Sequence, residues 1–209
     1  MIYQLEEQLW FPQPDEAEED GLLAVGGDLS VERLLLAYSQ GIFPWFSDET
    51  PILWYSPHNR FVIFPDHLHV SKSMQQVLRS GIFRITNDQA FDHVIMSCAK
   101  IDRKEQEGTW ITKQMQQAYI ALHKIGYAHS VEVWKGDALV GGLYGVVIGN
   151  VFCGESMFSK VNNASKAAII WLCKNKGFAM IDCQFHTLHL ESLGAEFISR
   201  KEYMSTLQD

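Results

Sequence analysis

Apolar residues recur at intervals of three and four positions in several stretches of the chain, which is the spacing of one face of an α-helix. One short stretch starts at Ser30, whose side chain can cap a helix, and stops at Gly41, which can end one. The pattern predicts helices between Ser30 and Gly41 and over residues 71–80, 88–99, 112–125 and 164–176.

A second pattern, the alternation of apolar and polar residues, is typical of strands and begins at residue 129. The predicted strands are 129–134, 138–148, 151–156, 179–184 and 195–198. Short turns join the first three, so these strands should be antiparallel. With the helices in between, the order predicts an α/β (α+β) mixed sheet flanked by helices on both faces. This order resembles the acyltransferase fold shared by N-acetyltransferases.

The prolines separate the first part of the chain from the rest. All six lie between Pro12 and Pro65, and none follows. Proline fixes φ and lacks an N–H donor, so it interrupts regular elements. We therefore expect a small N-terminal domain with short elements over residues 1–62 and a regular domain over residues 63–209.

The N-terminal part contains a dense group of aromatic residues between residues 42 and 55. They are Phe43, Trp45, Phe46, Trp54 and Tyr55. Such a group can form a small apolar core, or it can offer a surface on which a nucleic-acid base stacks. The sequence leaves both interpretations open.

The composition is that of a globular protein: 47% of the 209 residues are hydrophobic and 20% are charged. The longest strongly apolar run, residues 167–173, is far shorter than the roughly 20 residues that span a bilayer. The first residues include acids where a signal peptide carries positive charge, and the four cysteines form no C-x-x-C pair. We therefore expect a cytoplasmic protein with reduced thiols and no membrane contact.

The net charge of −8 argues at first against a nucleic-acid partner, because binding to phosphates requires lysine and arginine. However, residues 1–20 contain seven acids and no lysine or arginine. Residues 61–209 contain 14 acids and 15 bases, so their net charge is +1. The acidity belongs mainly to the N-terminal segment and does not exclude local contact with RNA in the larger predicted domain.

Common cofactor and nucleophile motifs are missing. The pairs His67-x-His69 and His186-x-x-His189 lack a convincing further ligand group for a metal. The glycine pairs lack the context of a phosphate-binding loop, and no G-x-S-x-G segment is present. We expect neither a metal nor a cofactor.

Two segments place polar side chains where apolar residues surround them. Glu155 stands within FCGESMFS, so it must be paired, face water or serve a function. Asp182 and Gln184 would share one face of the predicted strand 179–184, because side chains alternate along a strand. They can form a structural hydrogen-bonded pair or a functional one.

Nine segments follow one another at suitable spacing from about residue 10 to residue 205. They are GLLAVGGDLS, GIFPWF, WYSP, GTWIT, HSVEVW, LVGGLYG, FCGESMFS, NASK and IDCQ. Together they resemble the leucyl/phenylalanyl-tRNA–protein transferase family. The resemblance implies a small N-terminal domain joined to an acetyltransferase-like domain.

The resemblance also implies an activity. Members of this family transfer leucine, phenylalanine or methionine from aminoacyl-tRNA to proteins with N-terminal arginine or lysine, which marks the acceptor for degradation. We accordingly expect aminoacyl-tRNA and such proteins as partners, and a monomer as the default oligomeric state.

By the same resemblance, the amino-acid side chain would enter an apolar pocket. Its walls would be Leu143, Phe152, Met157, Ile169, Leu172 and Ile181. Trp45 would stack near the terminal adenosine of the tRNA, with Trp110 as a second candidate and Tyr119 as a supporting group.

The family also suggests roles for the polar residues. Gln184 would hold the attacking amine through its carbonyl oxygen, with Asp182 orienting its amide. Glu155 would face the cationic acceptor residue or help to fix the aminoacyl group. Lys72, Arg79 and Arg84 form a thin basic patch for tRNA, which Lys100, Arg103 and Lys104 either extend or merely adjoin as a solvated loop.

Two other functions remain compatible with the element order and the aromatic residues. An acetyl-CoA-dependent acyltransferase would have a related fold, but the pattern [QR]-x-x-G-x-[GA] is missing around residues 154–166. A non-catalytic module that binds peptides or RNA would use the aromatic residues and leave Asp182 and Gln184 without a role.

Overall fold

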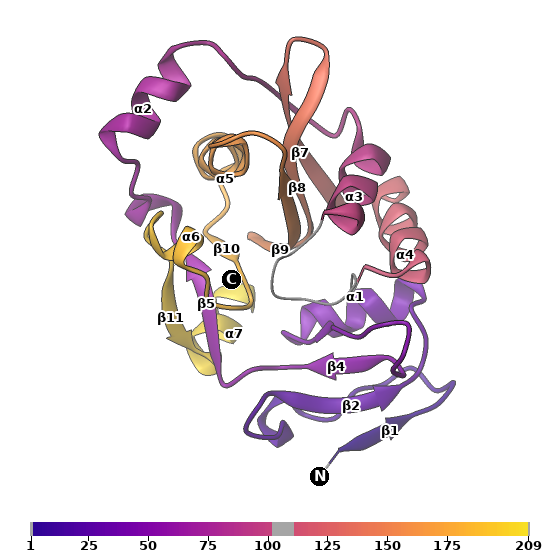
Figure 1. Ribbon diagram of the computed structural model, residues 1–209. Helices are drawn as coiled ribbons and strands as arrows, with labels where there is room; N and C mark the ends of the chain where they lie inside the picture. The colour runs from indigo at the N-terminus through magenta and orange to yellow at the C-terminus, as the bar shows by residue number, and fades with distance from the viewer. Residues whose placement is uncertain (1, 102–110, 209) are drawn as a thin grey trace.

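The computed structural model describes residues 2–101 and 111–208. Its N-terminal part contains a four-stranded sheet in the order β1-β2-β4-β3, with one helix beside it (Figure 1). The strands are β1 (Tyr3–Leu5), β2 (Leu22–Gly26), β3 (Phe43–Pro44) and β4 (Leu53–Tyr55). The helix α1 (Val31–Ser39) begins at Ser30, whose hydroxyl accepts the N–H of Arg33, as the sequence predicts. The short elements agree with the high proline content.

A second sheet of seven strands forms the larger part of the molecule, in the order β11-β5-β10-β9-β8-β7-β6. Its strands are β5 (Asn59–Ile63), β6 (Arg84–Asn87), β7 (Ala128–Lys135), β8 (Ala138–Ile148), β9 (Val151–Ser159), β10 (Met180–Asp182) and β11 (Glu196–Ser199). Strands β9 and β10 run parallel, and the other neighbours run antiparallel. The predicted mixed α/β sheet is therefore confirmed.

Helices cover both faces of this sheet. On one face lie α3 (Phe91–Lys100) and α4 (Lys113–Lys124), and on the other lies α5 (Ala164–Asn175) (Figure 1). The remaining helices are α2 (Lys72–Arg79), α6 (Leu188–Glu191), α7 (Arg200–Gln208) and the short 3-10 helices Pro14–Glu16 and Pro65–His67. Alternate strand residues divide between two apolar clusters: Val62 packs with the α3 and α4 side, whereas Phe61 and Ile63 pack with the α5 side.

Glycines in β8 allow helix α5 and a neighbouring side chain to approach the sheet closely. A Cβ atom on Gly141 would lie 2.5 Å from the Cβ of Ala164, the first residue of α5. A Cβ atom on Gly145 would lie 2.6 Å from the ring of Phe152. The glycine-rich segment LVGGLYG therefore supplies space for packing rather than a loop.

The ends of β5 and β10 bear on two predictions about the organisation of the chain. The predicted strand 179–184 is too long, because β10 ends at Asp182 and Gln184 has a φ of +61°. The predicted domain boundary at residue 62 falls within β5, which pairs with β10 and β11 of the larger sheet. The boundary itself stays a prediction.

Within the described residues, every helix is too short or too polar to cross a membrane.

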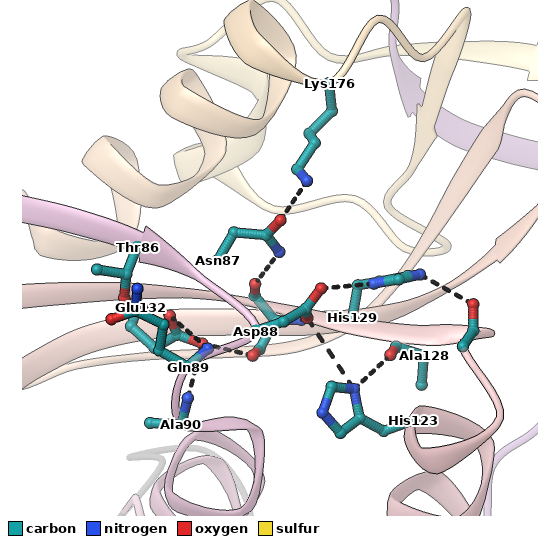
Figure 2. Close-up of polar contacts among 12 residues, drawn as sticks. Thr86, Asn87, Asp88, Gln89, Ala90, His123, Ala128, His129, Glu132 and Lys176 are labelled. Atoms are coloured by element: carbon teal, nitrogen blue, oxygen red, sulfur yellow. Dashed lines mark hydrogen bonds and ion pairs between the residues drawn. The ribbon is translucent and has the colours of Figure 1, made fainter.

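A polar cluster holds β6, β7 and the end of α4 together (Figure 2). Asp88 Oδ2 lies 2.7 Å from Nδ1 of His129, and Asp88 Oδ1 accepts the N–H of Ser130 at 2.8 Å. The hydrogen bond with Asp88 raises the pKa of His129 above its ordinary value. Burial opposes ionisation of Asp88, but its contacts with His129, Ser130 and His123 together outweigh burial, so the pKa of Asp88 is lowered.

This pair should make the stability depend on pH. Because the pKa of His129 is raised on folding, its contribution is complete below the unfolded value of about 6.5 and is lost as the pH rises through the folded value. His129 and Asp88 are partly exposed, so we expect a contribution below about 1 kcal/mol. The control is His93→Asn, which replaces an exposed histidine outside this cluster.

Denaturant unfolding at several pH values tests this expectation. The loss of unfolding free energy above pH 6.5 should be smaller in His129→Asn than in the unaltered chain and in His93→Asn. Equal pH dependence in all three proteins would contradict the role assigned to the His129–Asp88 pair.

Candidate functional site

A cavity of about 830 Å³ opens where β9 and β10 separate. The two strands pair as far as Cys153 and Asp182, after which β9 continues and the chain beyond β10 turns away. The apolar wall of the cavity includes all six residues that the sequence predicts for an acyl pocket: Leu143, Phe152, Met157, Ile169, Leu172 and Ile181. The sheet, α5 and the gap between two strands therefore create one apolar pocket from residues spread over 39 positions.

Aromatic side chains line another part of the cavity. Trp45 is half-buried, and its ring lies 4.8 Å from that of Phe185, which also lines the cavity. Phe43, Phe46 and Trp54 are instead buried in the core. The aromatic group thus forms part of the core, while Trp45 lines the cavity.

Gln184 occupies a tight turn directly after β10. Its φ of +61° lies in the left-handed region, and the N–H of Phe185 donates to the carbonyl oxygen of Cys183 at 2.7 Å, which closes a γ-turn. The alternation argument that placed Asp182 and Gln184 on one strand face is therefore wrong. A turn, and not the strand, brings Gln184 into the cavity wall.

Glu155 on β9 holds the side chain of Gln184. The amide Nε2 of Gln184 donates to Glu155 Oε1 at 2.8 Å, and the hydroxyl of Tyr119 donates to Glu155 Oε2 at 2.9 Å. Only 6% of Glu155 is exposed, so the alternative that it faces water is wrong. Burial raises the pKa of Glu155 to about 7, although the hydrogen bonds from tyrosine and glutamine hold it down.

This contact orients the Gln184 amide. Because the Nε2 group donates to a carboxylate, the carbonyl Oε1 must point away from that carboxylate. Among the described residues, no donor reaches Gln184 Oε1 within hydrogen-bond distance. The carbonyl oxygen is thus available to accept a hydrogen bond from a ligand in the cavity.

Asp182 has a different partner from the one expected. Its Oδ1 accepts the main-chain N–H of Gln184 at 2.8 Å, whereas the side-chain amide belongs to Glu155. The expected orientation of that amide by Asp182 is therefore corrected: Asp182 fixes the backbone of the turn. The carboxylate also forms a two-pronged ion pair with Arg60, and both side chains are buried.

Tyr119 lies behind the cavity wall and extends the network to the N-terminal part. It is fully buried, and its hydroxyl lies 2.6 Å from the hydroxyl of Tyr38 on α1. Tyr119 therefore contacts Glu155 rather than the cavity itself. Any role in substrate binding would be indirect.

The predicted basic patch lies apart from the residues that line the cavity. Lys72 and Arg79 on α2 and Arg84 on β6 are exposed, and Arg84 lies over the ring of Trp134 at 5.1 Å. Trp110, the second stacking candidate, lies outside the described residues, as do Arg103 and Lys104.

Sequence reasoning missed Arg60 and Phe185 as members of the site. A signal for Arg60 was present, because it precedes the apolar run 61–64 and shares a strand face with the buried Val62. A charge at such a position requires a buried partner. Phe185 offered no such signal, since its exposure depends on the turn at Gln184.

Comparisons with known proteins agree on one family. The family model described as "Leucyl/phenylalanyl-tRNA protein transferase" matches residues 62–208, and the model of its N-terminal domain matches residues 27–58. A relative with this enzyme name from Syntrophus aciditrophicus is 57% identical over 95% of this chain and 84% of its own length. One from Flavobacterium johnsoniae is 53% identical over 99% of both chains.

The likeness to one solved structure is loose. A GCN5-related N-acetyltransferase from Kribbella flavida overlays with a TM-score of 0.38 and 10% identity, over 77% of this chain and 58% of that one.

The network around Glu155 generates a titration prediction. A hydroxyl that donates to a carboxylate favours its charged form, so Tyr119→Phe should raise the pKa of Glu155 above its value of about 7. Carbon NMR of labelled glutamate carboxyl groups measures this titration. The exposed Tyr127 provides the control, because Tyr127→Phe should leave the titration unchanged. An unchanged or lowered pKa in Tyr119→Phe would contradict the assignment.

Proposed function

The chain belongs to the leucyl/phenylalanyl-tRNA protein transferase family of aminoacyltransferases, and on this premise we propose its substrates and the roles of its site residues. The donor is tRNA charged with leucine, phenylalanine or methionine. The acceptor is a protein with N-terminal arginine or lysine, and the added residue marks it for degradation. The observation that carries the proposal is the apolar cavity with the Glu155–Gln184 pair in its wall.

The apolar part of the cavity supports the choice of amino acid. A side chain of leucine, phenylalanine or methionine would lie among Phe152, Ile169 and Leu172, with the flexible Met157 adapting to its shape. Branching at Cβ would widen the ligand close to its backbone, so valine and isoleucine should fit poorly. Shape alone discriminates by about 1–3 kcal/mol, which agrees with acceptance of several unbranched or γ-branched groups.

The reaction is aminolysis of an ester. The acceptor nitrogen forms a bond to the aminoacyl carbonyl carbon, and the bond from that carbon to the ribose oxygen of the tRNA breaks. The nitrogen loses one proton and the departing ribose oxygen gains one, which gives an amide and a free ribose hydroxyl. A free α-amine has a pKa of about 7.7–8.0, so an appreciable fraction is neutral near pH 7. The main task of the site is therefore to position the amine beside the ester.

Gln184 would perform this positioning. Its Oε1 is available to accept an N–H of the amine, because its Nε2 already donates to Glu155. The Glu155 carboxylate would also favour a cationic acceptor residue through its charge, to the extent that it is ionised. Asp182 would act indirectly, by holding the main chain of Gln184.

The tRNA would bind at two places. The terminal adenosine would stack on Trp45, a contact that contributes about 1–3 kcal/mol. Phosphates further along the tRNA would contact Lys72, Arg79 and Arg84. The involvement of Trp110, the cytoplasmic location and the monomeric state stay predictions.

A transfer assay tests the proposed function. Labelled leucine on its tRNA is incubated with a peptide that begins with arginine, and the labelled peptide is quantified. We expect transfer to arginine and lysine peptides, and none to a peptide whose N-terminus is acetylated. Gln184→Ala should reduce turnover by roughly 10- to 100-fold while the protein stays folded. Absence of transfer by the unaltered protein would refute the substrate assignment, and full turnover in Gln184→Ala would refute the role of this residue.

The basic patch generates a separate prediction about salt. Replacing Lys72, Arg79 and Arg84 together by alanine should raise KM for charged tRNA and flatten its salt dependence, with a slope change of about 0.7–0.9 for each lost phosphate contact. The KM for a minimal donor, leucyl-adenosine, should not change. The control replaces the exposed Lys124, Lys135 and Lys201. Equal effects of both triple substitutions would show that net charge, and not this patch, governs tRNA binding.

A further inference from the structure

We propose that Arg60 is a positioning residue for the transfer reaction, which it serves by fixing Asp182 and, through Asp182, the turn that presents Gln184 to the cavity. Arg60 is not among the residues that line the cavity, so it acts without touching substrate. This inference rests on the proposed function, because it assigns a cause to the position of Gln184 in that reaction.

The surroundings of Arg60 hold its guanidinium in one place. Its Nε lies 3.3 Å from Asp182 Oδ1, its Nη2 donates to Asp182 Oδ2, and its Nη1 donates to the carbonyl oxygen of Gly41 at 2.9 Å. The group also lies 4.7 Å from the ring centre of Phe43 and 4.4 Å from that of Tyr203. Only 1% of Arg60 is exposed, so solvent does not compete for these contacts.

One oxygen atom of Asp182 connects Arg60 to the turn at Gln184. Asp182 Oδ1 accepts from Arg60 Nε and also from the main-chain N–H of Gln184. A non-glycine residue at a φ of +61° costs about 1–3 kcal/mol and persists only where its surroundings hold it. The hydrogen bond with Asp182 stabilises this conformation of Gln184. Asp182 can form it only while its own carboxylate is held in place, which the contacts with Arg60 do.

The two contacts between the Arg60 guanidinium and the Asp182 carboxylate require an arginine. A guanidinium contacts both oxygens of a carboxylate and so fixes the rotation of its plane, whereas a lysine ammonium acts as a point charge. A lysine at position 60 would preserve charge neutrality but release the Asp182 plane. The turn would loosen, and the Gln184 amide would lose its defined position opposite Glu155.

Arg33 provides a matched control. It is also 1% exposed, and its guanidinium donates to the main-chain oxygens of Glu6 and Gln8. Arg33 does not line the cavity and has no contact with Asp182. Arg33→Lys therefore reports the effect of replacing a buried arginine without disturbing the site.

The first experiment compares Arg60→Lys, Arg33→Lys and the unaltered protein in the leucine transfer assay, with folding monitored by circular dichroism. A shift of catalytic groups by about 1 Å can lower rates by about 100-fold. We expect kcat to fall by roughly 10- to 100-fold in Arg60→Lys. KM for charged tRNA should stay nearly constant, and Arg33→Lys should keep its kcat.

A double-substitution cycle shows whether Arg60 acts through Asp182. The set comprises Arg60→Gln, Asp182→Asn and the double variant, whose neutral pair leaves no unpaired buried charge and so favours folding. If Arg60 acts through Asp182, the double variant should have the same kcat as Asp182→Asn alone. Residues that act independently would instead give multiplied effects.

The outcomes separate this inference from the proposed function. Transfer by the unaltered protein together with a normal kcat in Arg60→Lys would overturn the role of Arg60 and leave the function standing. An equal loss of kcat in Arg33→Lys, or independent effects in the cycle, would also overturn it. Without transfer by the unaltered protein, the proposed function itself fails.

Discussion

A buried ion pair between Arg60 and Asp182 ties the parts of this structure together. Burial opposes the charge of Arg60, but its interactions with Asp182, Tyr203 and Cys153 together outweigh burial, so the pKa of Arg60 lies above its ordinary value. Removing two ions from water costs several kcal/mol for each ion and demands close, well-oriented partners. The partners come from β10, from Gly41 and Phe43 in the N-terminal part and from α7, so these segments must assemble for the charge to be accommodated.

The same ion pair lies at the point where the sheet opens. Strands β9 and β10 pair up to Asp182, and the cavity begins where their pairing stops. On the apolar side, the cavity is shaped by packing between the sheet and α5. On the polar side, Glu155 connects Gln184 to Tyr119 and Tyr38, so one carboxylate links the cavity wall to α4 and α1. A pKa of about 7 lets this carboxylate gain or lose its proton near neutral pH.

The sequence predicted the helices α1–α5 and the strands from β7 onward, but it located none of the strands β1–β6. Ser30 caps a helix where its side chain indicated, and α4 begins after Thr112 within the predicted range 112–125. The glycines of β8 lie in a strand that alternation and turns had located. The family resemblance also pointed to six apolar residues, all of which line the cavity. Prediction failed at Gln184, because a strand pattern cannot reveal a left-handed turn that distant side chains stabilise.

The sequence by itself determined the helices α1–α5 and the strands from β7 onward, because side-chain periodicity, caps and short turns act over a few positions. Its resemblance to a known family pointed to six apolar residues that line the cavity. Only the tertiary structure decided the partners of Glu155, Asp182 and Arg60. The last two are separated by 122 positions, and no local pattern encodes which buried charges will meet. Their pairing follows from the strand order and the packing of α1 and α7, and it sets the place of Gln184.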